Sequence, residues 1–264
     1  MNYKIDNVDL IEFGARSTNA SGEKIALSGL FSLPKRTGTT EYDWGTSIEP
    51  YIDAADIILD GRSLTLNVAI KGSTLSDFHA KLTAFKEACI DCRKLWTEVG
   101  EFSVIQKDEI TVTEYPFNFI ALVKVPFWEE EYLPAAITLV ASGTGDYMLD
   151  SYNLVKDFGI FVSSFRDVNS KAKRIDVSTT LPYTTTSYRS YYDLSMQCKM
   201  VGSGIPDLYS KISQFNALCI NPGVHTLKLP GNTARSVYFK DGTTVTCLSP
   251  RILQFDLKCR VING

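Results

Sequence analysis

The sequence predicts an α+β protein that is mainly β, with two tandem duplicated β-sandwich or barrel domains and one principal helix in each. Two observations lead to this prediction. Residues 64–90 and 194–220 align without a gap, and 8 of the 27 aligned pairs are identical. Around both regions, short runs of alternating apolar and polar residues are separated by Gly, Pro and Asp, which is typical of sheets that bury one face.

Composition excludes several classes of protein. Apolar residues make up 44% of the 264 residues and charged residues 22%, as in globular chains and unlike disordered, collagen-like or coiled-coil ones. The formal net charge of −3 does not suit a strongly basic nucleic-acid binder. The most apolar stretch, residues 117–128, is interrupted by Asn118, Lys124 and Pro126, so we expect no membrane insertion. No secretory signal is visible, so we expect synthesis in the cytoplasm.

A second similarity defines the length of each copy. Residues 10–14 (LIEFG) resemble residues 155–159 (VKDFG) at an offset of 145, whereas the longer match has an offset of 130. The first copy therefore carries 15 extra residues between the two matches, and we expect them within residues 34–52, which are rich in Gly, Thr, Pro and charge. This defines a first domain over residues 1–134, with a longer loop at 34–52, and a second domain over residues 135–264.

Both predicted domains have the same internal order. Apolar and polar residues alternate over 64–70 and over 194–200, which predicts a strand in each. A helix follows, with Ser76 as the expected N-cap in the first copy and Ser203 or Gly204 in the second. Further strands are expected at 101–106, 109–114, 117–125, 226–229, 236–239, 243–248 and 253–262, with a hairpin turn at Asp241-Gly242.

Apolar residues also recur on one face of each predicted helix, at i, i+4, i+7 and i+11. They are Phe78, Leu82, Phe85 and Cys89 in the first copy, and Leu208, Ile212, Phe215 and Cys219 in the second. We therefore interpret Cys89 and Cys219 as core residues, and the same interpretation extends to the other four cysteines. Cys89 and Cys92 form a CxxC sequence, so a redox or metal role is the alternative.

One order of elements carries a family resemblance. It comprises a strand at 62–72, a helix at 75–90 and a closing run, ALVKVPFW, at 121–128. A mainly β unit of this kind resembles the tail-tube fold of tailed bacteriophages, as used by distal tail and baseplate-hub proteins. The second copy ends in RVING, without the Pro-aromatic run. Distal tail proteins usually pair one tube-like domain with a different one, so the tandem duplication is closer to hub proteins, in which three chains build a pseudo-sixfold ring.

This resemblance implies a virion structural protein of a phage or prophage tail. It would be a distal tail or baseplate-hub ring component that links the tail tube to the tip or receptor-binding apparatus around a DNA channel. The implied partners are further copies of the chain in a closed trimer or hexamer, other tail proteins of the tube, tip or fibre, and DNA only as passing cargo. A ring is also favoured by the edge strands of small β units, because head-to-tail association covers each edge.

Two polar segments with aromatic residues supply the candidate interface. The candidates are Glu41, Asp43 and Trp44 in the predicted loop, and Tyr183, Tyr188, Tyr191 and Tyr192 among Thr and Ser residues. The loop either contacts a neighbouring ring or is simply solvated. The tyrosines suit a strand edge, a protein interface or stacking on sugar rings. The last possibility defines the alternative function, a carbohydrate-binding or adhesin-like β module.

No constellation of residues predicts catalysis. We interpret Glu129-Glu130-Glu131, beside Trp128, as a solvated charge run and not as an acid–base pair. His79 has no nucleophile motif near it, and the sequence lacks GxSxG, HExxH and P-loop motifs. We therefore expect no enzyme activity, no cofactor and no metal site.

Overall fold

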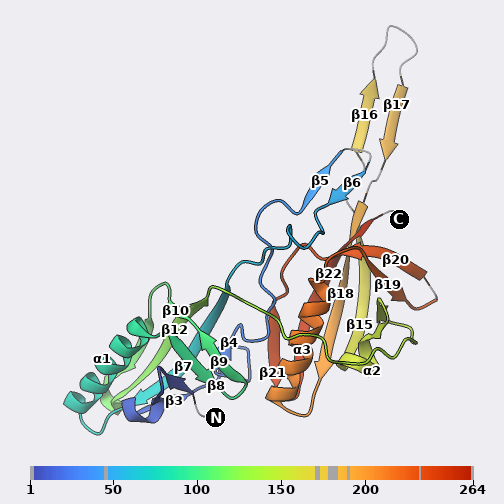
Figure 1. The fold of residues 1–264 in the computed structure, drawn as a ribbon. Helices are drawn as coiled ribbons and strands as arrows, with labels where there is room; N and C mark the ends of the chain where they lie inside the picture. The colour runs from blue at the N-terminus through green and yellow to red at the C-terminus, as the bar shows by residue number, and fades with distance from the viewer. Residues whose placement is uncertain are drawn as a thin grey trace.

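The computed structural model describes residues 3–44, 47–169, 173–177, 184–188, 191–231 and 233–262. In this part of the chain the protein is mainly β, as the sequence predicts, with several sheets and few helices. Figure 1 shows two groups of sheet and helix side by side, which we call the first half (residues 3–129) and the second half (residues 148–262). The hairpin of β16 and β17 extends away from the second half (Figure 1).

The first half contains a sheet in the order β10-β12-β7-β3, to which β4 and β11 add, and a smaller sheet in the order β2-β1-β8-β9. Its elements are β1 (Lys4–Ile5), β2 (Val8–Asp9), η1 (Leu10–Phe13), β3 (Ala15–Ser17), β4 (Leu27–Ser28), β5 (Glu41–Asp43), β6 (Ile48–Pro50), β7 (Arg62–Lys71), α1 (Leu75–Asp91), β8 (Lys94–Thr97), β9 (Gly100–Ser103), β10 (Ile105–Gln106), β11 (Thr111–Tyr115), η2 (Pro116–Asn118) and β12 (Ile120–Glu129).

The second half contains a sheet in the order β14-β13-β19-β20-β22-β18-β15, to which β21 adds beside β22. Its elements are β13 (Met148–Leu149), β14 (Tyr152–Asn153), α2 (Leu154–Phe158), β15 (Ile160–Asn169), β16 (Lys173–Val177), β17 (Thr184–Tyr188), β18 (Tyr191–Val201), α3 (Ile205–Cys219), β19 (His225–Leu229), β20 (Thr233–Tyr238), β21 (Val245–Ser249) and β22 (Ile252–Ile262).

The two halves share one order of elements. In the first, β7 lies between β3 and β12, and Ile70 pairs with both Ala15 and Ala121. In the second, β18 lies between β15 and β22 in the same way. Each central strand leads into the principal helix of its half, α1 or α3, and a hairpin of two strands follows. The division into domains at residue 134 stays a prediction.

Residues that are identical in the two halves make the same contacts at the helix starts. The Asp77 carboxylate accepts a hydrogen bond from the Ser73 N–H at 2.7 Å and lies 2.8 Å from Lys81 Nζ. Hydrogen bonds from Lys81 and Ser73 lower the pKa of Asp77 to about 2. The start of α3 repeats both contacts at 2.7 and 3.0 Å, through Ser203, Asp207 and Lys211. Side-chain chemistry therefore accounts for these identities.

The helix starts differ from the prediction in one detail. Helix α1 begins at Leu75, and its N-cap is Thr74, whose hydroxyl accepts the Asp77 N–H at 3.2 Å. Ser76 lies inside the first turn, so its assignment as the cap is wrong. The cap of α3 is Gly204, one of the two predicted residues.

The predicted apolar stripes of the two principal helices lie in the core of each half. Phe78, Leu82, Phe85 and Cys89 are the buried residues of α1, and the corresponding residues of α3 are buried as well. All six cysteines are buried and unpaired with one another. Burial raises the pKa of Cys92 to about 11 and that of Cys198 to about 12, which is opposite to the shift of a reactive thiolate.

The extra residues of the first half lie in two places. Ala15 and Leu27 pair with β7 at the same two places where Ile160 and Phe165 pair with β18 in the second half. Leu27 follows Ala15 by 12 positions, whereas Phe165 follows Ile160 by only five. Seven of the extra residues therefore fall in 18–26 and not in 34–52. Residues 34–52 are also not only loop, because β5 and β6 form a hairpin there.

The hairpin predicted at Asp241-Gly242 is wrong. β20 pairs with β19 and β22, and β21 pairs with β22, so the strands on either side of Gly242 do not pair with each other. A Cβ atom on Gly242 would lie 2.5 Å from the Leu33 carbonyl oxygen and 2.7 Å from the Lys35 nitrogen. The glycine therefore serves a close approach of the first half to the second.

Candidate interaction surfaces

The two halves meet edge to edge, at a contact that we call the joint. Lys24 N–H donates to the Cys247 carbonyl of β21 at 2.8 Å, and Leu33 and Thr243 exchange two N–H···O bonds at 2.9 Å. The residues of the first half that make these bonds flank β4, the edge strand beside β7. The strands therefore follow one another across the molecule as β12, β7, β4, β21, β22, β18 and β15 (Figure 1), and β11 pairs with β12 at the first-half end of this succession.

Helix α3 is covered on its outer side as well as its core side. The connecting segment runs along it: Asn216 donates to the Tyr132 hydroxyl at 3.0 Å, and Ser213 Oγ accepts the Ala135 N–H at 2.7 Å. The Tyr209 ring lies 6.5 Å from Phe31 and 6.0 Å from Phe102 of the first half, measured between ring centroids. These contacts explain why polar residues of α3 are buried.

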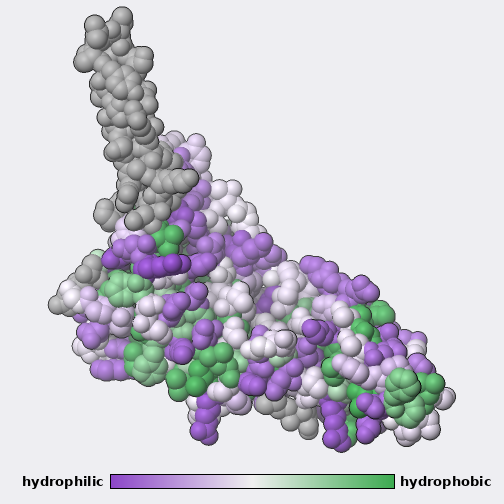
Figure 2. Space-filling view, turned by 180° about the vertical axis from the view of Figure 1, so that it is seen from behind, coloured by the Kyte–Doolittle hydropathy of each residue, from purple (hydrophilic) through white to green (hydrophobic). Residues whose placement is uncertain are grey.

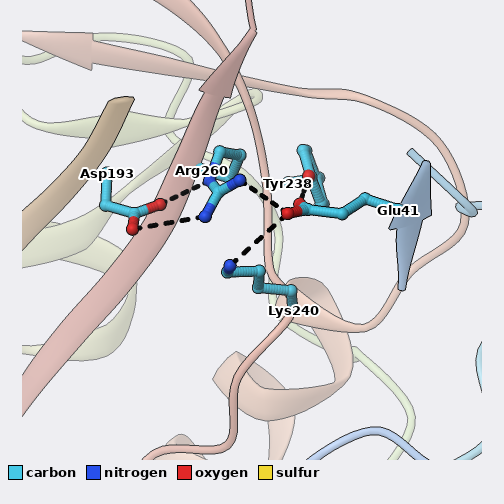
Figure 3. A network of polar contacts seen from close by, with 5 residues as sticks. All are labelled: Glu41, Asp193, Tyr238, Lys240 and Arg260. Atoms are coloured by element: carbon cyan, nitrogen blue, oxygen red, sulfur yellow. Dashed lines mark hydrogen bonds and ion pairs between the residues drawn. The ribbon is translucent and has the colours of Figure 1, made fainter. Parts of the chain in front are cut away.

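Glu41, a predicted interface residue, holds the β5–β6 hairpin against the second half (Figure 3). Its carboxylate accepts hydrogen bonds from the Tyr238 hydroxyl and from Arg260 Nη1, the latter at 2.6 Å. Arg260 also donates to Asp193 at 2.5 Å, and Lys240 Nζ lies 3.7 Å from Glu41. Burial and the Glu41 carboxylate raise the pKa of Tyr238 well above its ordinary value. Glu41 therefore has a partner within its own chain.

Trp44, by contrast, lies on the surface. Its side chain is 62% exposed and its ring centroid lies 4.4 Å from that of Tyr42, which is 47% exposed. The indole N–H donates to Glu49 on β6 at 2.8 Å, which fixes the ring. Asp43, between the two aromatics, pairs with Ile48 in the hairpin. The hairpin thus presents a fixed aromatic pair, Tyr42 and Trp44, which sequence reasoning only half identified.

The tyrosine-rich segment is placed in part. Tyr183 lies outside the described residues. Tyr188 pairs with Lys173 in the β16–β17 hairpin, and Tyr191 pairs with Ile262 at the start of β18. The Tyr192 ring is half-buried, and the Arg235 guanidinium lies 5.6 Å from its centroid.

The two candidate segments, far apart in the sequence, lie at one end of the molecule. Arg260 joins them, because it contacts Glu41 of β5 and pairs with Asp193, which follows Tyr192 on β18. Figure 1 accordingly shows β5 and β6 beside the base of the β16–β17 hairpin. The sequence alone gave no sign of this proximity.

One residue of the acidic run is not solvated. Glu129 is buried and pairs with Arg62, so its interpretation as part of a solvated charge run is wrong. The neighbouring Glu130 and Glu131 line an open cavity of about 600 Å³ together with Trp128. His79 is exposed on α1.

Large apolar side chains are also exposed elsewhere on the surface. They include Phe117, Leu133, Val140, Phe161 and Phe165. On the face opposite to that of Figure 1, apolar residues gather along the lower side of both halves (Figure 2). Within the described ranges, no group of three or more His, Cys, Asp and Glu residues is arranged so that it could hold a metal ion. In the same ranges, no helix has the length and hydropathy needed to cross a membrane.

Fold and surfaces together define a mainly β protein in which two similar halves meet edge to edge. No protein-family model matches the chain, and no curated protein matches its sequence. Among solved structures, the chain is similar to the Dit protein of phage SPP1, described as a paradigm of the hub adsorption apparatus in phages that infect Gram-positive bacteria. The identity is 11%, the TM-score is 0.33, and the match covers 97% of this chain and 98% of that chain.

Proposed function

We propose that the protein is a structural component of a phage or prophage tail, a distal tail or baseplate-hub ring protein. The observation that carries this proposal is the joint, where two halves of similar plan meet edge to edge within one chain. A unit that meets a second unit in this manner is suited to continue the arrangement with further copies, and head-to-tail contacts close into rings when the rotation permits.

The tandem plan gives such a ring two units per chain. We propose that residues 1–134 and 135–264 arose by duplication of one tube-like unit, which the shared contacts of Asp77 and Asp207 support. Unequal insertions then differentiate the two units: the β5–β6 hairpin on one, and the β16–β17 hairpin on the other. Alternate positions around the ring therefore present different surfaces to neighbouring tail proteins.

The end of the molecule that carries both hairpins is the proposed contact with other tail proteins of the tube, tip or fibre. Its exposed aromatic pair, Tyr42 and Trp44, is of the residue type that anchors protein interfaces. In this role the protein acts by assembly and not by catalysis, DNA passes through the ring as cargo, and the protein resides in the virion tail.

The native mass of the purified chain tests the proposal. Light scattering or native mass spectrometry over a range of concentrations is expected to give three or six chains. Three chains support a pseudo-sixfold ring in which both units lie side by side, as they do at the joint. Six chains also support a ring, but one with twice that number of units. A chain that stays monomeric at every concentration contradicts the ring.

A further inference from the structure

The second half ends in an open strand edge. β15 (Ile160–Asn169) is the last strand of its sheet, and the hydrogen bonds of its described backbone go to β18. Along its length Phe161, Phe165 and Val168 are exposed, at 49%, 42% and 43%. A long edge strand with exposed apolar residues is a template for pairing with another chain.

The first half ends in an open edge of a different type. β11 (Thr111–Tyr115) pairs with β12, and in the described part of the chain no second strand lies on its other side. Four of its five residues are exposed. Phe117, at the turn between β11 and β12, is 99% exposed.

The joint shows which types of edge fit each other. β21 is the counterpart of β11, because each forms an antiparallel pair with the closing strand of its half, β22 or β12. β15 is the counterpart of β3 and β4, because each lines the central strand, β18 or β7. Within the chain, the β21 edge meets the β4 side. The two edges left open are therefore one of each type.

The bonds of the joint also indicate how β11 would be engaged. Val245 of β21 directs its N–H outward to the Ser32 hydroxyl at 3.1 Å, and the Cys247 carbonyl accepts from Lys24. The residues in the same register on β11 are Val112 and Glu114, opposite Val123 and Ala121 of β12. Their outward N–H and C=O groups occupy the positions that the joint uses in the second half.

We propose that β11 of one copy docks against β15 of the next copy, so that the chain contacts itself head to tail through unlike edges. This inference rests on the proposed ring and names the surfaces that would build it. Contact between two β15 edges or two β11 edges would pair edges of the same type, whereas the joint pairs edges of different types. When unlike edges at opposite ends of the strand succession dock, the pair of chains still has one free β11 edge and one free β15 edge, so that further chains can add in the same way.

The helices support the same arrangement. Tyr209 of α3 packs against Phe31 and Phe102 of the first half across the joint. The residue at its position in α1 is His79, which is exposed. The His79 face of α1 thus lacks the cover that Tyr209 gives α3, and a neighbouring second half docked at β11 would supply it.

Site-specific cross-linking tests the pairing in the full chain. Glu114→Cys places a thiol on β11 and Arg166→Cys places one on β15, both at exposed positions, while the six native cysteines are buried. A flexible bismaleimide then links thiols that lie within a few residues of each other across the contact. Lys258→Cys, exposed on β22 inside the sheet, is the matched control for Arg166→Cys.

The expected result is a linked dimer when the Glu114→Cys and Arg166→Cys chains are mixed, with little from either variant alone or from Glu114→Cys mixed with Lys258→Cys. Self-linking of either variant alone at the same yield would overturn the inference. So would association by light scattering without links in the mixture, an outcome that leaves the ring itself intact. A chain that is monomeric and unlinked contradicts both the inference and the ring.

A second variant separates docking from folding. Phe165→Asp is expected to weaken association at least tenfold while the single chain stays folded, because Phe165 is exposed at 42% and loses within the chain an edge contact with the Tyr147 ring, 6.4 Å away between centroids. Ile58→Asp, an exposed apolar residue at 60% on neither edge, is expected to leave association unchanged. Equal effects of the two substitutions would overturn the inference.

Discussion

The buried ion pair of Arg62 and Glu129 allows a direct test of how the first half is held together. Arg62 Nε–H donates to Glu129 Oε2 at 2.7 Å, and Nη2 lies 2.6 Å from the same oxygen. Nη1–H donates to the Leu30 carbonyl at 2.6 Å. The two side chains are only 3% and 11% exposed. Glu129→Ala leaves the guanidinium buried without its carboxylate, which we expect to cost about 3–5 kcal/mol of unfolding free energy.

Urea denaturation followed by circular dichroism measures this cost, and the melting temperature should fall on the order of 10 °C. The double variant Arg62→Met, Glu129→Leu is expected to lose less than Glu129→Ala alone, since it leaves no charge unpaired. The control is Asp9→Ala, which removes an exposed pair with Lys4 and should cost below about 1 kcal/mol. A cost for Glu129→Ala as small as that for Asp9→Ala would refute the reasoning.

Three further predictions concern other parts of the molecule. Gly242→Ala should destabilise the protein by about 1–3 kcal/mol in urea, because its Cβ meets backbone at 2.5 Å. Gly204→Ala, whose Cβ would lie 3.9 Å from Pro206, should cost less. Because the folded pKa of Asp77 is lowered from 3.8 to about 2, its contribution is present above pH 3.8 and lost as the pH falls toward 2. The Asp77→Asn variant should therefore show a shallower loss of urea midpoint over that range, and an unchanged slope contradicts this. Glu41→Gln removes the charge beside Arg260 and should cost about 1–3 kcal/mol by thermal unfolding, and a neutral result would mean that the hairpin is held by other contacts.

Local patterns predicted the elements that bury one face. The stripe of Phe78, Leu82, Phe85 and Cys89 identified α1 because a helix with one buried side leaves a 3.6-residue period in the sequence. The cap was misplaced by two residues, since Thr74 and Ser76 are both good caps and only the Asp77 N–H decides between them.

Local sequence patterns could not predict contacts between segments that lie far apart in the sequence. Gly242 follows an Asp as hairpin glycines do, but here the glycine admits the backbone of Leu33 and Lys35. Glu41 looked like a surface charge, and its partners Tyr238 and Arg260 are about 200 positions away in the sequence. No periodicity in the sequence records such pairs.

The segment between the halves has a consequence for how the chain tolerates cleavage. Val140 is 89% exposed. Before it in the sequence, Ala135 and Thr138 are hydrogen-bonded to α3, and after it Ser142 is hydrogen-bonded to α2. A protease that cuts at Val140 would thus break the covalent link without touching the hydrogen bonds of the joint. The two fragments should stay together after such a nick, and separately produced fragments should reassemble when mixed.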